Sequence, residues 1–257
     1  MNNRKPKTVM FYSPQGGTGK STLSLNTAIF AAMRGFKTLL IDMSIYGSIM
    51  SSLRIPMKGG NGLSSVITHL DLEVNIKEPM RFNEALKGSI VKSSVQGNLD
   101  VLTGGNPIRV EALSQEYVRD IINSVRSLGY NMIVIDTSSE LSVKNLILFE
   151  MVDYVFMPVI QDVSCGWKMM LFKEVIEKCV LEKNKFKVII NMCSRYSGFN
   201  NLEFETEIGF ETIGEIPLYI KKYQNFINRG DQIHLKYNKK AYMRFQDIAS
   251  TIISLKY

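Results

Sequence analysis

A short strand that runs directly into a glycine-rich loop and then a helix constrains this chain more than any other feature. Residues 8–13 (TVMFYS) are apolar, residues 14–19 (PQGGTG) hold three glycines, and residues 20–34 are rich in Ala, Leu and Ile. Glycine permits the positive φ angles and the close approach by which backbone N–H groups surround a phosphate. The start of the helix adds a partial positive charge. The order strand, loop, Lys-Ser and helix therefore predicts a phosphate-binding loop.

Continuous apolar runs of about six residues recur along the chain and alternate with segments of helical length. A strand without polar alternation is typical of a parallel sheet that is covered on both faces. Strands and helices that alternate in this way predict an α/β fold, namely a doubly wound, mostly parallel sheet flanked by helices. The six expected strands are residues 8–13, 37–42, 98–103, 131–136, 154–159 and 186–191.

The helices between these strands are expected to have recognisable ends, such as a serine N-cap or a glycine stop. Residues 43–97 are less regular and contain several glycines and serines, which predicts short helices and mobile loops. No linker or repeat interrupts the pattern, so we expect residues 1–257 to form a single domain. The three clearest helices are residues 20–34, a segment from the N-cap Ser114 to about Leu128, and residues 163–182.

The loop carries the side chains that a nucleoside triphosphate and Mg²⁺ require. Lys20 is expected to contact the β- and γ-phosphates, Ser21 to hold Mg²⁺, and Thr22 to reach the α-phosphate. Backbone N–H groups of the loop supply further phosphate contacts. We therefore predict ATP or ADP with Mg²⁺ as the cofactor, bound by Gly16, Gly17, Thr18, Gly19, Lys20, Ser21 and Thr22.

The loop departs from the general P-loop because Pro14 stands where that pattern has a glycine. It resembles instead the deviant Walker A loop of the ParA/MinD family of ATPases, whose pattern is K-G-G-x-x-K-[ST]. Three later segments are similar to that family in the same order, so the resemblance extends over the whole chain. They are residues 39–53 (LLIDMSIYGSIMSSL, its switch region), 132–141 (MIVIDTSSEL, its Walker B segment) and 215–230 (EIPLYIKKYQNFINRG, the segment that closes over the base).

The resemblance implies roles for residues at the ends of the expected strands. Asp136 matches the Mg²⁺-linked aspartate of the Walker B segment, and Asp42 matches the first aspartate of the switch region. The implied metal site thus comprises Ser21, Asp42 and Asp136, and Asp42 is also the candidate catalytic residue. Asn191 falls where the family contacts adenine, and Pro217 belongs to the segment that closes over the base.

Two residues depart from the family pattern, and both departures concern hydrolysis. At the position of Gln15 the family has a signature lysine that reaches the phosphates of a partner subunit, as an arginine finger does. At the position of Ser44 it has an aspartate that positions the attacking water, a task for which a serine hydroxyl is poorly suited. These departures predict nucleotide binding with weak or absent ATP hydrolysis. The alternative is that another basic residue replaces the lysine, with Arg109 and Arg195 as candidates.

The resemblance predicts a positioning protein that forms a nucleotide-dependent homodimer and recruits a protein partner. Residues 101–105 (VLTGG) and 114–126 (SQEYVRDIINSVR) are most similar to the TadZ/CpaE branch, which localises pilus or secretion machinery. A second hypothesis is DNA partition, with non-specific DNA bound by basic residues within 221–244. A third is a bacterial tyrosine-kinase-like domain. It is disfavoured because that family has a C-terminal tyrosine cluster, whereas here only Tyr257 ends the chain, and because Ser44 replaces the acidic residue.

Charge and hydropathy narrow the surroundings in which the chain is expected to work. The net charge is +7, and residues 216–257 hold eight Lys or Arg against two Asp or Glu, which suits DNA, an acidic partner or a solvated face. No apolar run reaches the roughly 18 residues that span a bilayer. We therefore expect a cytoplasmic protein without stable membrane insertion. The resemblance further implies that a partner brings it to a cell pole or to the inner face of the membrane. Residues 241–255 are amphipathic, and we expect their apolar face to pack on the sheet.

Overall fold

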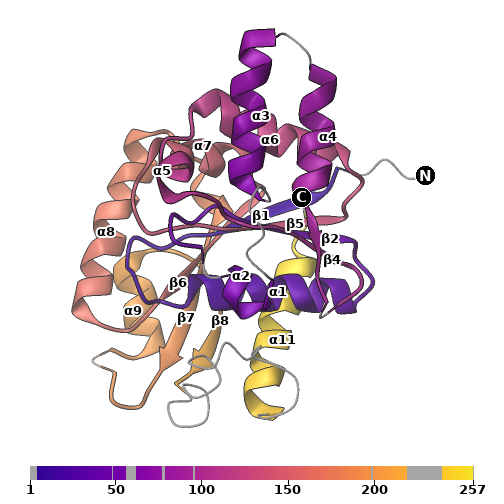
Figure 1. Cartoon of the computed structure of the whole chain (residues 1–257). Helices are drawn as coiled ribbons and strands as arrows, with labels where there is room; N and C mark the ends of the chain where they lie inside the picture. Colours follow the sequence, from indigo (N-terminus) through magenta and orange to yellow (C-terminus); the bar gives the residue numbers. More distant parts are fainter. Residues whose placement is uncertain are drawn as a thin grey trace.

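One sheet runs through the middle of the protein (Figure 1). The computed structural model describes residues 5–47, 49–55, 62–76, 79–94, 96–197, 199–218 and 239–256. Within these residues the sheet has eight strands in the order β3-β4-β2-β5-β1-β6-β7-β8, and only the β3–β4 pair is antiparallel. The strands are β1 (Lys7–Phe11), β2 (Thr38–Asp42), β3 (Val91–Lys92), β4 (Leu99–Leu102), β5 (Met132–Asp136), β6 (Tyr154–Val159), β7 (Phe186–Cys193) and β8 (Thr212–Pro217).

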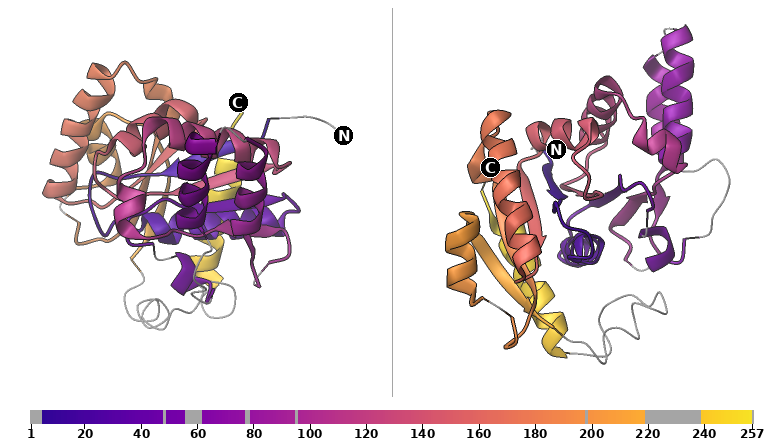
Figure 2. Two further views of the ribbon diagram at one scale, coloured as in Figure 1. Left: turned by 45° about the horizontal axis from the view of Figure 1, so that its top comes forward. Right: turned by 90° about the vertical axis from the view of Figure 1, so that its left-hand side faces the viewer.

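Helices cover both faces of this sheet (Figure 2). Helices α1, α2 and α11 pack on one face, and helices α3 to α9 pack on the other. The helices are α1 (Lys20–Met33), α2 (Ile49–Ser52), α3 (Leu63–Ile76), α4 (Pro79–Ser89), α5 (Pro107–Glu111), α6 (Gln115–Ser127), α7 (Val143–Met151), α8 (Val163–Lys178), α9 (Asn201–Ile208) and α11 (Lys239–Ser254).

Strand side chains alternate between two apolar layers, which explains the unbroken apolar runs in the sequence. In β1, Val9 and Phe11 belong to the apolar cluster that contains α1 and α11. Met10 and the following Tyr12 belong to the cluster on the opposite face. The doubly wound, mostly parallel α/β fold predicted from the sequence is therefore confirmed.

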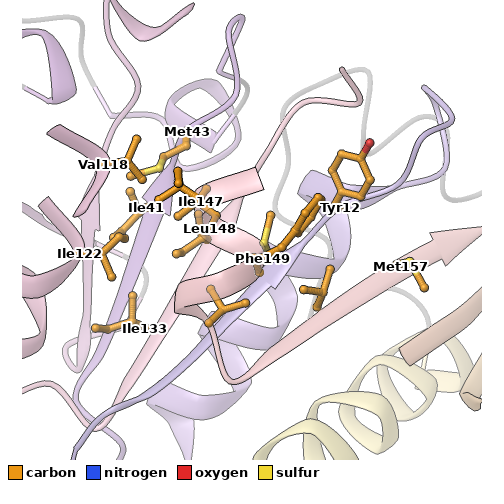
Figure 3. Packing of buried hydrophobic residues seen from close by; sticks show 14 of the residues in the cluster. Tyr12, Ile41, Met43, Val118, Ile122, Ile133, Ile147, Leu148, Phe149 and Met157 are labelled. Atoms are coloured by element: carbon orange, nitrogen blue, oxygen red, sulfur yellow. The ribbon is translucent and has the colours of Figure 1, made fainter. Parts of the chain in front are cut away.

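An aromatic cluster fixes the point at which β1 passes into the glycine loop. The ring of Tyr12 lies 4.9 Å from that of Phe149 in α7 and 5.0 Å from that of Phe172 in α8. Figure 3 shows Tyr12 and Phe149 side by side within the core. Tilted and edge-on aromatic pairs of this kind contribute about 0.5–1.5 kcal/mol beyond their buried area. The cluster therefore holds the start of the loop at a defined distance from α7 and α8.

Most predicted elements agree with the structure to within one or two residues at their ends. Ser114 caps α6 as expected, because its hydroxyl accepts a hydrogen bond from the N–H of Tyr117 at 3.2 Å. Helix α8 ends at Lys178, earlier than predicted, since Val180 adopts a φ of +55° that a helix does not allow. Strand β7 continues two residues further than predicted, to Cys193.

The region 43–97 is more regular than the sequence predicts. Helix α3 has 14 residues and α4 has 11, and the two stand side by side, projecting from the sheet (Figures 1 and 2). The expectation of only short helices and loops is therefore wrong here. The signal for α3 is present in the sequence, because buried apolar side chains recur at helical spacing. They are Leu63, Val66, Ile67 and Leu70.

Helix α11 closes the face of the sheet that also carries α1. Phe245, Ile248, Ala249 and Ile252 are buried in the same apolar cluster as the inner face of α1. This arrangement confirms that the apolar side of the last amphipathic segment packs on the protein. Among the residues that the structure describes, no helix is both long enough and apolar enough to cross a membrane.

Truncation of Ile252 tests this packing. Ile252 is fully buried, so Ile252→Ala is expected to lower the free energy of unfolding by about 2–5 kcal/mol, the range for a buried Ile reduced to Ala. Met243→Ala on the same helix is the matched control, since Met243 is 50% exposed. The control is expected to change stability by less than about 0.5 kcal/mol. Urea unfolding followed by circular dichroism measures both, and equal midpoints for the two variants would contradict the packing.

Candidate functional site

Three neighbouring parallel strands end at one edge of the sheet and carry the glycine loop and two aspartates. The strand register places Asp42, the last residue of β2, opposite Asp136, the last residue of β5. It also places Asp136 opposite Phe11, the last residue of β1, from which the loop continues into α1. Ligands of doubly wound sheets bind at the carboxyl ends of the strands. This edge is therefore the candidate functional site.

The loop backbone adopts the conformation that its glycines were expected to allow. Gly17 has a φ of +75° and Gly19 a φ of +93°. A β-carbon on Gly19 would lie 2.3 Å from the Nδ2 atom of Asn191, so a larger residue here would displace the Asn191 amide. The same Nδ2 atom donates to the carbonyl oxygen of Thr18 at 2.7 Å. The structure thus brings Asn191 of β7 to the loop, and its contact with adenine stays a prediction.

Lys20 lies against the loop and forms no ion pair within the described residues. Its Nζ atom donates to the carbonyl oxygen of Gln15 at 3.3 Å and to the hydroxyl of Ser139 at 2.5 Å. Burial lowers the pKa of Lys20, while the charges of Asp136 and Glu140 act in the opposite direction. A partly desolvated ammonium group without an ion-pair partner is suited to binding an anion.

Asp136 is a fully buried carboxylate whose two oxygens accept no hydrogen bond from the described residues. The hydroxyl of Ser24, which lies nearby, donates instead to the carbonyl oxygen of Ser21 at 3.1 Å. Burial and the charge of Asp42 raise the pKa of Asp136 to about 7, against the opposing effects of the nearby Ser21 and Ser24 hydroxyls and of Lys20. A buried carboxylate without partners is costly, and a cation would remove that cost.

Asp42, in contrast, is held by hydrogen bonds from the turn that follows it. Its Oδ1 atom accepts from the backbone N–H of Ser44 at 3.2 Å and from the hydroxyl of the same residue, and its Oδ2 atom accepts from the N–H of Ile49 at 3.2 Å. Burial raises the pKa of Asp42, and these hydrogen bonds lower it. A β-carbon on Gly47 would lie 2.4 Å from Oδ2. Glycine at this position therefore allows the turn to close around the carboxylate.

The residues present fit a magnesium ion that is held largely by a nucleotide. Mg²⁺ in such sites takes one or two protein oxygens and completes its octahedron with water and phosphate oxygens. Asp136 and the hydroxyl of Ser21 offer such oxygens, whereas those of Asp42 already accept hydrogen bonds. In the described part of the chain, no group of three or more His, Cys, Asp or Glu side chains could hold a metal alone. Such a site suits a metal that arrives with its nucleotide.

A lysine that the sequence did not single out lies beside Gln15. Lys168, on α8, donates from its Nζ atom to the side-chain oxygen of Gln15. The two arginines considered as replacements for the family lysine have other contacts: Arg109 bonds to α3, and Arg195 donates to the hydroxyl of Tyr196 at 2.6 Å. Among the described residues, the basic side chain that contacts the Gln15 amide is therefore that of Lys168, and neither Arg109 nor Arg195 does so.

A cleft of about 630 Å³ lies at the carboxyl ends of β7 and β8. Its lining includes Cys193, Arg195, Glu215 and Pro217. Pro217 ends β8 opposite Cys193, at the same edge of the sheet as the loop. A volume between about 300 and 1,000 Å³ is typical of small-molecule sites. The later part of the segment predicted to close over the base, residues 219–230, lies outside the described residues.

Two buried or half-buried lysines at the site carry no signal in the sequence. One is Lys168, and the other is Lys144 of α7, which is 1% exposed. The Nζ atom of Lys144 donates to the carbonyl oxygen of Met43, within the turn after β2, at 2.8 Å. Burial lowers the pKa of Lys144, and nearby carboxylates act in the opposite direction. Both lysines come from helices far from the loop in sequence, so no motif spacing could have found them.

The fold and the loop define a P-loop protein of the doubly wound α/β class. A family model described as an AAA domain matches residues 6–188 of this chain. The chain therefore belongs to this family and, with the relatives described below, to the ParA/MinD group of P-loop ATPases. The family resemblance stated from the sequence is thus confirmed.

Two curated relatives show moderate sequence similarity. The chromosome-partitioning ATPase Soj of Treponema pallidum is 28% identical over 155 residues, which cover 59% of this chain and 56% of Soj. The tyrosine-protein kinase YwqD of Bacillus subtilis is 29% identical over 143 residues, which cover 55% of this chain and 54% of YwqD. This chain thus spans a little over half the length of the curated relatives it matches.

Solved structures share the fold over nearly the whole chain. A chain of the MinC:MinD cell division protein complex of Aquifex aeolicus superposes with a TM-score of 0.79 at 21% identity, covering 98% of this chain and 97% of that one. A putative plasmid partition protein from Borrelia burgdorferi, bound to AMPPNP, superposes with a TM-score of 0.71 at 20% identity and covers 97% and 99% of the two chains. At these identities the likeness establishes the fold.

The raised pKa of Asp136 predicts a pH-dependent stability of the ligand-free protein. Burial and the charge of Asp42 raise the pKa of Asp136 from 3.8 to about 7, so we expect the folded protein to keep a proton there up to about that pH. The contribution of protonated Asp136 to the free energy of unfolding is therefore complete below pH 4 and is lost as the pH rises through 7. Asp136→Asn removes the contribution of Asp136 to this dependence and is expected to stabilise the ligand-free protein at pH 8, by on the order of 2–4 kcal/mol. Urea unfolding in EDTA at pH 5 and pH 8 measures the effect.

The exposed Asp120 provides the control for this experiment, because Asp120→Asn changes the same charge on the surface. The control is expected to leave the pH dependence unchanged. A wild-type protein that is more stable at pH 8 than at pH 5 by the same margin as Asp136→Asn would contradict a protonated Asp136.

Proposed function

We propose that this chain is an ATP-binding positioning protein of the ParA/MinD type. It binds ATP or ADP with Mg²⁺ at residues 16–22, dimerises around the nucleotide, and localises a pilus, secretion or other cellular complex through a protein partner. The observation that carries the proposal is the unpartnered, buried carboxylate of Asp136 beside a positive-φ glycine loop. A buried carboxyl group without a protein partner is explained most simply by a ligand that the site is built to receive.

Each part of the nucleotide has a candidate partner at this edge of the sheet. Backbone N–H groups of the loop and the ammonium of Lys20 suit the phosphates, and Ser21 with Asp136 suits the magnesium ion. The cleft beside Pro217 has the volume for a nucleoside. Asn191, already bonded to Thr18, lies between the loop strand and this cleft in the order of the sheet. In this assignment Asn191 and Pro217 contact the base.

Weak or absent hydrolysis is part of the proposal, and Ser44 supports it. The hydroxyl of Ser44 is buried and donates to Asp42, so its proton is already engaged. A neutral hydroxyl is also a poor base for an attacking water. Gln15 contributes an amide to the loop where the family has a charge. Ser44 takes no part in the phosphate contacts of this assignment, so binding and turnover are separable.

Exposed apolar side chains near the loop support a protein–protein contact. Val163 and Trp167, in the first turns of α8, are 74% and 61% exposed. The same helix places Lys168 against Gln15. Aromatic side chains such as that of tryptophan are enriched in interfaces. This surface would suit contact with the second subunit of a nucleotide-dependent homodimer or with a protein partner of the kind implied by the TadZ/CpaE resemblance.

Removal of the Lys20 ammonium group tests nucleotide binding. Lys20→Ala is expected to weaken Mg-ATP binding by about 100-fold or more, because the charge-assisted contacts to two phosphates are lost. Lys173→Ala on α8 is the control and is expected to bind as the wild type does. Isothermal titration calorimetry measures both. Phosphate release by the wild-type protein is expected to stay below about 1 s⁻¹, the low end of common turnover numbers.

Two results would contradict the proposal in different ways. Equal affinity of the wild type and Lys20→Ala for Mg-ATP would remove the nucleotide site. Turnover well above about 1 s⁻¹ would leave the site in place and overturn only the weak hydrolysis.

DNA partition is the second candidate, favoured by basic side chains on α11. Lys239, Lys240 and Arg244 are exposed in the first turns of this helix. The relative Soj is named a chromosome-partitioning ATPase. The remaining residues of the predicted basic set, Lys221, Lys222 and Lys236, lie outside the described part of the chain.

Charge reversal on α11 distinguishes the two candidates. If DNA is the partner, non-specific duplex binding appears at low salt with ATP and falls steeply as salt rises, since phosphate contacts release counterions. The double variant Lys239→Glu, Lys240→Glu is then expected to bind every duplex sequence more weakly. Reversal of the exposed Lys178 on α8 serves as the control. Under the positioning proposal we expect no duplex binding by the wild type in a fluorescence anisotropy titration at low salt.

A further inference from the structure

Lys168 brings a second ammonium group to the start of the glycine loop. Its Nζ atom donates to the side-chain oxygen of Gln15, and the Nζ atom of Lys20 lies 3.3 Å from the backbone oxygen of the same residue. Gln15 therefore joins two cations that come from different helices, α8 and α1.

The described residues compensate these two charges only in part, because Asp136 and Glu140 act on Lys20 without pairing with it. Within the described residues, no carboxylate forms an ion pair with Lys20 or Lys168. Two positive charges held against one residue repel each other, and more strongly where burial excludes water, as it does at Lys20. An anion bound beside them removes this repulsion. The arrangement therefore favours a polyanionic ligand at this end of the loop.

The packing of α8 explains why Lys168 stays in this position. Cys165 and Met169 of the same helix are fully buried in the core, and the ring of Phe172 lies 5.0 Å from that of Tyr12. Tyr12 precedes Gln15 by only three residues. The helix that carries the lysine and the start of the loop are thus held in one packed unit, so the lysine keeps its distance from Gln15.

We propose that Lys168, oriented by the amide of Gln15, binds the γ-phosphate of ATP and supplies the charge that the family pattern places within the loop. This inference rests on the proposed ATP site. Lys20 is the side chain expected at the β- and γ-phosphates, and Gln15 is its direct neighbour. The charge of Lys168 therefore lies at the terminal-phosphate end of the loop. A charge there distinguishes ATP from ADP.

The affinities for AMPPNP and for ADP, both with Mg²⁺, test this assignment. Lys168→Gln is expected to weaken AMPPNP binding by roughly 10- to 100-fold, the range for a lost hydrogen bond to a charged group. ADP binding is expected to change by less than about threefold, because ADP has no γ-phosphate. Lys178→Gln, on the exposed side of the same helix, is the matched control. Calorimetry and the fluorescence of Trp167, the single tryptophan, provide two readouts.

Moving the charge back into the loop provides a second test. Gln15→Lys alone places a third ammonium group beside two others and is expected to give no gain in AMPPNP affinity. Gln15→Lys combined with Lys168→Gln restores one charge at the same end of the loop. The double variant is expected to bind AMPPNP within about threefold of the wild type. Lys168→Arg, which keeps the charge, is expected to bind more tightly than Lys168→Gln. A purely structural role of Lys168 would not produce this rescue.

The outcomes separate the inference from the proposed function. If the wild type binds neither nucleotide, both are wrong. If the wild type binds both nucleotides and Lys168→Gln binds AMPPNP equally well, only the role of Lys168 is wrong. A parallel loss of AMPPNP and ADP affinity would also overturn it, since Lys168 would then only shape the loop. Thermal unfolding of each variant confirms that it is folded.

Discussion

The parallel pairing of β5 with both β1 and β2 is the constraint on which the site depends. The register of these strands sets the end of β1, Asp42 and Asp136 beside one another. Because each strand is buried on both faces, a shift in register would move apolar side chains out of their layers. The core therefore determines where the two carboxylates lie. Loop and carboxylates meet at one edge because parallel strands all end there.

This geometry places the carboxyl group of Asp136 near the ammonium group of Lys20 without an ion pair between them. Asp136 accepts no hydrogen bond from the described residues. Burial raises the pKa of Asp136 and lowers that of Lys20, which favours the neutral form of each. Asp42 differs because the turn through Ser44 and Ile49 donates to it. In the proposed function, a metal ion and a triphosphate would supply the partners that the described residues do not. Their binding would therefore also stabilise the folded chain.

The two departures from the family pattern have different surroundings in the structure. At Gln15 a positive charge is present, although it comes from α8 rather than from the loop. At Ser44 the side chain is a neutral hydroxyl bonded to Asp42. In our proposal, the charge of Lys168 beside Gln15 preserves nucleotide recognition, and the neutral hydroxyl of Ser44 slows hydrolysis. A protein with these properties would hold ATP for long periods, which suits the stable marking of a site in the cell.

The amino-acid sequence by itself determined the α/β class, the glycine loop with Lys20, and the carboxylate of Asp136, because each depends on a local pattern of a few residues. The sequence contains the helical spacing of α3, but the glycines and serines nearby favoured short helices and loops, so the full length of α3 and α4 was not predicted. Only the tertiary structure decided that Lys168 contacts Gln15 and that Lys144 supports the turn after β2. The physical reason is that these contacts join residues about 100 or more positions apart, and packing of helices on the sheet, rather than any spacing along the chain, brings them together.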